Sequence, residues 1–64
     1  MKLDLIYDRE SDAAYLRFSS EKVLESSEVS PGVMIDYDAS GRMVAIEILH
    51  AHKMLPLETL TAAE

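Results

Sequence analysis

The sequence lacks several residues on which small proteins often depend. Its 64 residues include no cysteine and no tryptophan, and only two glycines, two prolines and one phenylalanine. The absence of cysteine excludes disulfides and a thiolate zinc site. The scarcity of glycine and proline argues against a flexible linker or a low-complexity tail. A chain this short buries only about 60% of its unfolded surface, so its stability is marginal unless something else supports it.

Basic residues are also scarce. Six lysines and arginines face twelve aspartates and glutamates, which gives a formal net charge of −6. This charge repels phosphate backbones and anionic membranes, so we expect binding to neither nucleic acid nor membrane, and it suits a basic protein partner or plain solubility. No apolar run approaches the roughly 18 residues that span a bilayer, and the N-terminus has no signal-peptide layout. The sequence therefore predicts a cytoplasmic single domain over residues 1–64.

Alternating apolar residues predict strands through most of the chain. Residues 2–7 and 14–18 alternate with period two around a polar connection, which predicts a first hairpin. Residues 23–29 are polar and predict an irregular or edge strand. Residues 33–38 and 43–49 alternate again and are rich in β-branched side chains. These strands follow one another along the chain like those of an antiparallel meander.

The pattern changes after residue 50. Met54, Leu57 and Leu60 recur every three residues, Pro56 suits the first turn of a helix, and Glu58 suits its N-terminal end. We expect a short helix from about Pro56. The predicted fold class is α+β: a small antiparallel β-meander of four to five strands with a short C-terminal helix.

One stretch has the spacing of a calcium-binding EF-hand loop. Asp36, Asp38 and Ser40 fall on the first, third and fifth ligand positions, Gly41 on the invariant sixth, and Glu47 on the twelfth. This spacing makes Asp36, Asp38 and Glu47 weak candidates for a divalent-metal site.

The surroundings of this stretch favour a β-hairpin instead. An EF-hand loop lies between two helices, but Pro31 and Gly32 break the entering one. Asp at the first position and Gly at the fourth of residues 38–41 suit a type I turn, in which Asp38 would accept hydrogen bonds from backbone N–H groups. We therefore predict a hairpin over residues 33–49.

Two registers of this hairpin are possible. A three-residue loop pairs Asp38 with Arg42, and turn chemistry alone favours it. An even loop pairs Asp38 with Met43 and gives one continuous apolar face, because a one-residue slip moves every side chain to the other face. We prefer the even loop, which sets Val33, Ile35 and Tyr37 opposite Ile48, Ile46 and Val44.

The opposite face of the predicted sheet collects polar side chains. Asp36 and Glu47 share it with Tyr15 and Arg17. Two neighbouring carboxylates repel, so they require hydrogen-bond donors, for which Arg17 and Tyr15 are the best placed. No nucleophile motif or phosphate loop accompanies them, so we predict a polar cluster with no catalytic residue. His50 and His52 have no third ligand at a useful spacing, and we interpret them as polar residues at a strand end rather than a metal pair.

Several short motifs of the chain together resemble those of one known family. They are Tyr7-Asp8, Asp12-Ala13-Ala14-Tyr15-Leu16, Gly32-Val33, Asp36-Tyr37-Asp38, Gly41-Arg42 and Ile46-Glu47-Ile48. The chain is similar to the YuzE-like family of small prokaryotic proteins of unknown function (DUF2283) from about residue 2 to residue 53. The resemblance implies an antiparallel sheet with a helical appendage, no assigned activity, and no catalytic or binding residues. The family pattern usually has glycine where this chain has Ala45.

The sequence favours a small non-catalytic interaction or regulatory module, such as an antitoxin-like partner of a basic protein, with no cofactor. The alternative is a divalent-metal-binding domain or metal-dependent enzyme that uses carboxylates on the sheet face. We also expect a homo-oligomer, because one short helix can cover only one of two surfaces that both carry apolar side chains.

Overall fold

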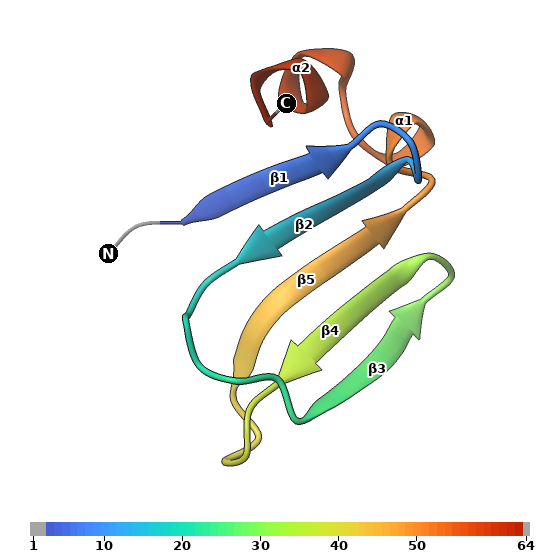
Figure 1. Ribbon diagram of the computed structural model, residues 1–64. Coiled ribbons are helices and arrows are strands. Elements are labelled where there is room, and N and C mark those ends of the chain that lie inside the picture. Colours follow the sequence, from blue (N-terminus) through green and yellow to red (C-terminus); the bar gives the residue numbers. More distant parts are fainter. Residues whose placement is uncertain (1–2, 64) are drawn as a thin grey trace.

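A computed structural model describes residues 3–63 of the chain. It contains a five-stranded antiparallel sheet followed by two short helices, which confirms the α+β class (Figure 1). Residue 2, where the first strand was expected to begin, lies outside the described residues. The elements are β1 (Asp4–Asp8), β2 (Ala13–Arg17), β3 (Glu25–Ser30), β4 (Val33–Tyr37), β5 (Met43–Leu49), α1 (Ala51–Met54) and α2 (Leu57–Ala63).

The strand order corrects the predicted meander. The order is β1-β2-β5-β4-β3, so the last strand lies in the centre of the sheet between β2 and β4. Burial explains this position: β5 carries apolar side chains on both faces, and its Val44 and Ala45 are fully buried. Every residue of β3 is exposed and most are polar, and this strand forms an edge, as predicted. The loop at 18–24 makes the crossover, with Phe18 N–H donating to the Val44 carbonyl and Leu24 N–H to the Tyr37 carbonyl.

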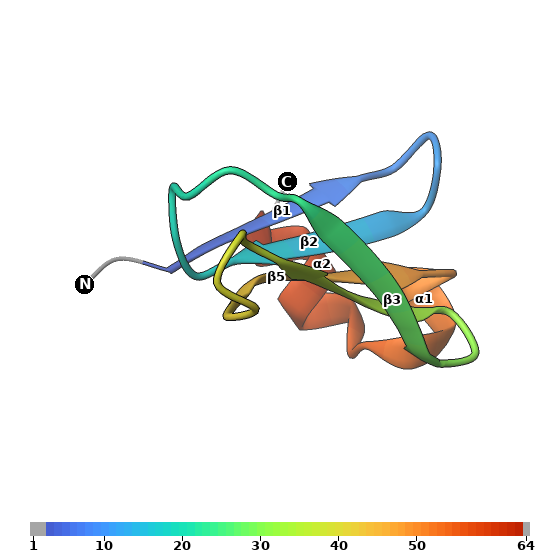
Figure 2. The same ribbon diagram turned by 90° about the horizontal axis from the view of Figure 1, so that it is seen from below.

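The two faces of the sheet differ in composition and in cover. Both helices lie on the same side of the sheet (Figure 2). They meet the apolar face, where Ala14, Ala51 and Leu60 form a buried cluster. Leu5, Tyr7, Ile48 and Leu55 pack against this cluster. The described residues 3–63 contain no helix that is both long and apolar enough to cross a bilayer.

The β4–β5 hairpin combines both predicted registers. Val33 lies opposite Ile48 and Ile35 opposite Ile46, as the even loop predicts. At the tip, however, Asp38 N–H donates to the Arg42 carbonyl, as in the three-residue loop.

A β-bulge reconciles these two pairings. Asp36 lies opposite Ala45, but Tyr37 lies opposite Met43 rather than the predicted Val44. Val44 is therefore the extra residue on β5, and it shifts the register by one. The turn keeps its preferred length, while the apolar side chains of the hairpin still share one face.

We expect Gly41→Val to destabilise the fold by about 2 kcal/mol, because Gly41 has a φ of 81° that a β-branched residue resists. A Cβ added at this position would meet no neighbouring atom within 4 Å, so the cost comes from backbone strain rather than a clash. Ala39→Val in the same turn is the control and should cost far less. Urea unfolding measures the stability of both variants, and equal losses would mean that the positive φ of Gly41 is not the cause of the cost.

The segment after β5 differs from the prediction. His50 has a φ of 52° and ends the strand, and Ala51–Met54 form the single turn of α1. His50 and His52 therefore do not share one side of a strand, and the interpretation of both as strand-end residues is wrong for His52. The predicted C-terminal helix is present as α2, one residue after Pro56.

Candidate functional site

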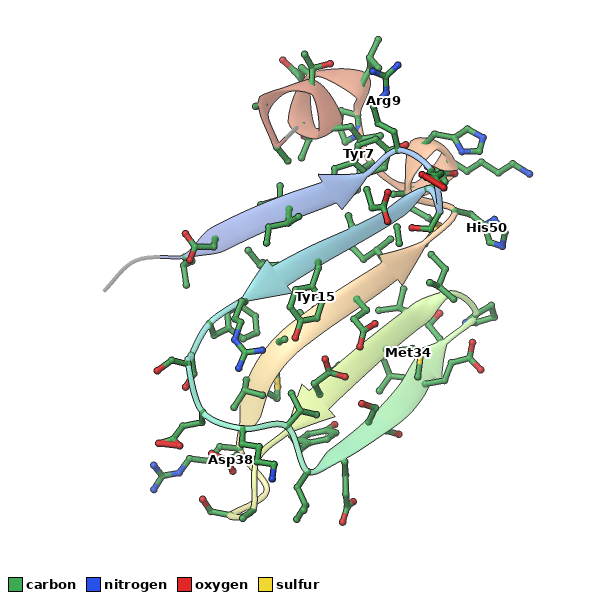
Figure 3. The ribbon with its side chains drawn as sticks, viewed as in Figure 1. Tyr7, Arg9, Tyr15, Met34, Asp38 and His50 are labelled. Atoms are coloured by element: carbon green, nitrogen blue, oxygen red, sulfur yellow. The ribbon has the colours of Figure 1, made fainter. Side chains whose placement is uncertain are left out.

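The face of the sheet away from the helices, which we call the open face, carries most of the sequence-predicted site residues. Figure 3 shows this face toward the viewer, with Tyr15 and Met34 projecting from it. Cross-strand pairing places five carboxylates and one guanidinium on it, interspersed with apolar side chains. The charged residues are Asp4, Asp8, Arg17, Glu28, Asp36 and Glu47.

Asp36 and Glu47 lie on adjacent strands at the middle of the open face. Asp36 is only 2% exposed, and its Oδ1 accepts a 2.6 Å hydrogen bond from the Ser26 hydroxyl on β3. Burial raises the pKa of Glu47, and a hydrogen bond to Asp36 together with the charge of Asp36 raises it further. A proton on Glu47 therefore relieves the repulsion between the two carboxylates.

The donors to these carboxylates differ from the expected ones. Arg17 Nη1 donates to the Tyr15 hydroxyl over 2.9 Å, while Nε and Nη2 donate over 2.6 Å to the carbonyls of Ser19 and Glu21. Arg17 thus holds the crossover loop and Tyr15, and Ser26 is the donor to Asp36. The Ser26–Asp36 pair requires β3 to lie beside β4, which alternation along the chain does not specify.

Asp38 lies apart from this pair, at the tip of the β4–β5 hairpin. Its Oδ1 accepts hydrogen bonds from the N–H groups of Ser40 and Arg42 at 2.9 and 3.0 Å, which confirms the predicted turn role. The bond from Arg42 is the main reason that the pKa of Asp38 is lowered. The segments on either side of the turn are the paired strands β4 and β5 rather than two helices, which confirms the predicted hairpin and not an EF-hand. Within residues 3–63, no three histidine, aspartate or glutamate side chains are placed to hold one metal ion.

A second polar network, which the sequence patterns did not indicate, joins the β1–β2 turn to the first helix. Tyr7 Oη donates to Asp12 Oδ1 over 2.6 Å, and His52 N–H donates to the same oxygen over 3.1 Å. His52 Nδ1 donates to Asp12 Oδ2, and Ala51 N–H donates to the Asp12 carbonyl. The hydrogen bond from Tyr7 is the main reason that the pKa of Asp12 is lowered. Asp12 therefore serves as the N-terminal anchor of α1, from 40 residues away in the sequence.

We expect Glu47→Gln to be more stable than the wild type at neutral pH, by on the order of 1 kcal/mol or less because solvent screens this half-buried group. The raised pKa means that the folded state binds the Glu47 proton more tightly than the unfolded chain. The stabilisation that this proton provides is thus complete below the ordinary pKa of 4.5, and it is lost as pH rises through the raised pKa.

Urea unfolding of both proteins between pH 4 and pH 8 measures this difference, in which contributions from Asp12 and Asp38 cancel. The advantage of Gln should grow as pH rises, and Asp36→Asn should flatten the profile of Glu47 because it removes the neighbouring charge. A difference that stays constant across this range would contradict the carboxyl pairing.

Comparison with known proteins identifies a family. The family model described as "Protein of unknown function (DUF2283)" matches residues 5–52, a span that includes both polar networks. No curated protein and no solved structure is significantly similar to the chain. Because the match covers three quarters of the 64 residues, the chain belongs to this family of proteins of unknown function.

Proposed function

We propose that the chain is a small, acidic, cytoplasmic interaction or regulatory module that binds a basic protein through the open face, in the manner of an antitoxin-like partner. The observation that carries this proposal is the charge of the open face, with five carboxylates and one guanidinium. Such a surface attracts a cationic partner and repels nucleic acid and anionic membranes.

Hydrogen bonding leaves this charge unbalanced. Arg17 is the one cation of the open-face strands, and its nitrogens already bind Tyr15 and loop carbonyls. Three carboxylates, those of Asp4, Asp8 and Glu28, belong to exposed residues at or near the two edge strands. The N–H groups of Glu10 and Gly32 donate to Asp8 and Glu28, but these donors carry no charge, so all three carboxylates still attract lysine and arginine side chains of a partner.

Apolar side chains on the same face suit an interface rather than plain solvation. Ile6 is 56% exposed and Leu49 38% exposed, and both lie among the carboxylates. Mixed apolar and charged surfaces are common where two proteins bind, with the apolar contacts supplying affinity and the charges orientation. The proposed role is non-catalytic because Asp36, the most buried carboxylate, is bonded within its own sheet.

Capture of partners from a lysate of the source organism, followed by binding measurements with the purified partner, tests this proposal. A variant with Asp4→Asn, Asp8→Asn and Glu28→Gln should lose most of its affinity for a basic partner, and binding should weaken as salt is raised. The control variant Glu10→Gln, Glu25→Gln and Glu58→Gln removes the same charge away from the open face. Equal binding by both variants, or affinity that does not change with salt, would refute the proposal.

The alternative role, divalent-metal binding, depends on Asp36 and Glu47, because Asp38 lies at the hairpin tip with its Oδ1 occupied by the turn. The adjacency of these two carboxyl groups is the observation that favours it. Melting in millimolar calcium or manganese, compared with chelator, separates the two roles. A metal-dependent rise in melting temperature that is absent from Asp36→Asn would support the metal site.

A further inference from the structure

The helices cover only part of the apolar face of the sheet. The helices make their main contacts with β1 and with each other, and Figures 1 and 2 place them toward the β1 side of the sheet. Leu16, Ile46 and Ile35 form a straight cross-strand row over β2, β5 and β4, with Val33 beside it. All four are half-buried and lie outside the cluster that the helices cover. We call these four residues the bare patch.

The accessible surface of the chain is larger than its mass predicts. It exposes 4702 Å², whereas a folded monomer of 7.2 kDa exposes about 4,100 Å². The molecule is also flat, with extents of 34 × 27 × 17 Å. An excess of roughly 600 Å² per chain has the size that each partner buries in the smallest specific interfaces, which bury about 1,200 Å² in total.

Charge indicates which partner fits the bare patch. On β1, β2, β4 and β5, the apolar face carries no carboxylate and no cationic side chain, unlike the open face. Each chain has a net charge of −6, so two copies repel each other except where both surfaces are neutral. A two-fold axis places identical patches against each other, and Ile46, at the centre of the row, would lie close to that axis.

We propose that two copies of this chain pack face to face through the bare patch and form a two-layer β-sandwich with both open faces outward. Stacked sheets of this kind lie about 10 Å apart and interdigitate their inner side chains. This proposal is independent of the proposed function, because it uses the opposite face of the sheet. The dimer would present two acidic faces to basic partners.

Sedimentation equilibrium at tens of micromolar protein tests the dimer. We expect twice the chain mass, and a dissociation constant that falls several-fold as salt rises from about 50 to about 500 mM, because salt screens the like charges of the two copies. Binding of a basic partner should weaken over the same range, so the two proposals fail separately. A monomer mass at both salt concentrations would overturn the dimer and leave the patch to a different protein.

A matched pair of variants identifies the face. Ile35→Lys introduces a charge on the bare patch and should give a folded monomer, whereas Ile6→Lys, on the open face, should remain dimeric. The reverse result would overturn the proposal. Because Ile35→Lys could unfold the chain, a second measurement uses the absence of cysteine: Ile46→Cys should cross-link between copies with a short bismaleimide, and Ile6→Cys should not. Cross-linking of Ile6→Cys alone would likewise overturn it.

Discussion

Leu60→Ala is expected to destabilise the protein by about 3 kcal/mol, a large part of the stability of a domain this small. Leu60 is 3% exposed and packs with Ala14 and Ala51 between α2 and the sheet. The other two buried members of this cluster are alanines, whose single methyl groups cannot fill the space that a removed isobutyl group leaves. Larger side chains pack around the cluster and can fill part of that space, so the cost combines the lost burial of Leu60 with a residual cavity.

Leu57 provides the control for this prediction within the same helix. It is 79% exposed, so Leu57→Ala should change stability by less than about 0.5 kcal/mol. Urea unfolding at one fixed protein concentration compares the two variants, because association would otherwise add to the apparent stability. Similar losses for both would mean that α2 does not present Leu60 to the sheet.

Asp12→Ala is expected to destabilise the protein well beyond an ordinary surface substitution, through two separate effects. It removes the acceptor for Tyr7 Oη, His52 N–H and the His52 ring. It also leaves a non-glycine residue at a φ of 54°, which alanine adopts less readily than aspartate. Thermal and urea unfolding measure the total.

Two further variants separate these effects. Asp12→Gly removes the acceptor without backbone strain, and Asp12→Asn keeps one acceptor oxygen and tolerates the positive φ, so Asn should cost the least. Because the pKa of Asp12 is lowered, its stabilisation is present above the ordinary value and is lost as pH falls through the lowered one. The advantage of the wild type over Asp12→Asn should therefore shrink in acid. Equal stability of all four proteins would show that the network does not anchor α1.

The local features of the fold were predictable because they depend on neighbouring residues. Alternation identified the strands, and Asp38 with Gly41 identified the turn. Each of the two predicted registers is correct for part of this hairpin. Turn chemistry determines the pairing at the tip, and side-chain alternation determines the pairing beyond it. The bulge at Val44 was not predictable, because it resolves a conflict between two rules that each hold locally.

The remaining features depend on contacts between distant segments. The place of β5 in the centre depends on which strand can be buried on both faces at once. The hydrogen bonds from His52 to Asp12 and from Ser26 to Asp36 follow from that order. The prediction that Tyr15 and Arg17 share a face with Asp36 and Glu47 agrees with the strand pairing. The hydrogen bonds of Arg17, however, depend on the path of the 18–24 loop, which the periodicity of the sequence does not predict.

The position of β5 also constrains how the protein can form during synthesis. The β1–β2 and β3–β4 hairpins are complete by residue 37, yet they pair with each other only through β5, which ends at residue 49. An isolated two-stranded hairpin is marginally stable at best in water. Neither hairpin is therefore expected to be stable before β5 has left the ribosome. Helix α2 then packs on β1. The sheet is therefore expected to form as one cooperative unit, and truncation after β4 should leave no stable half.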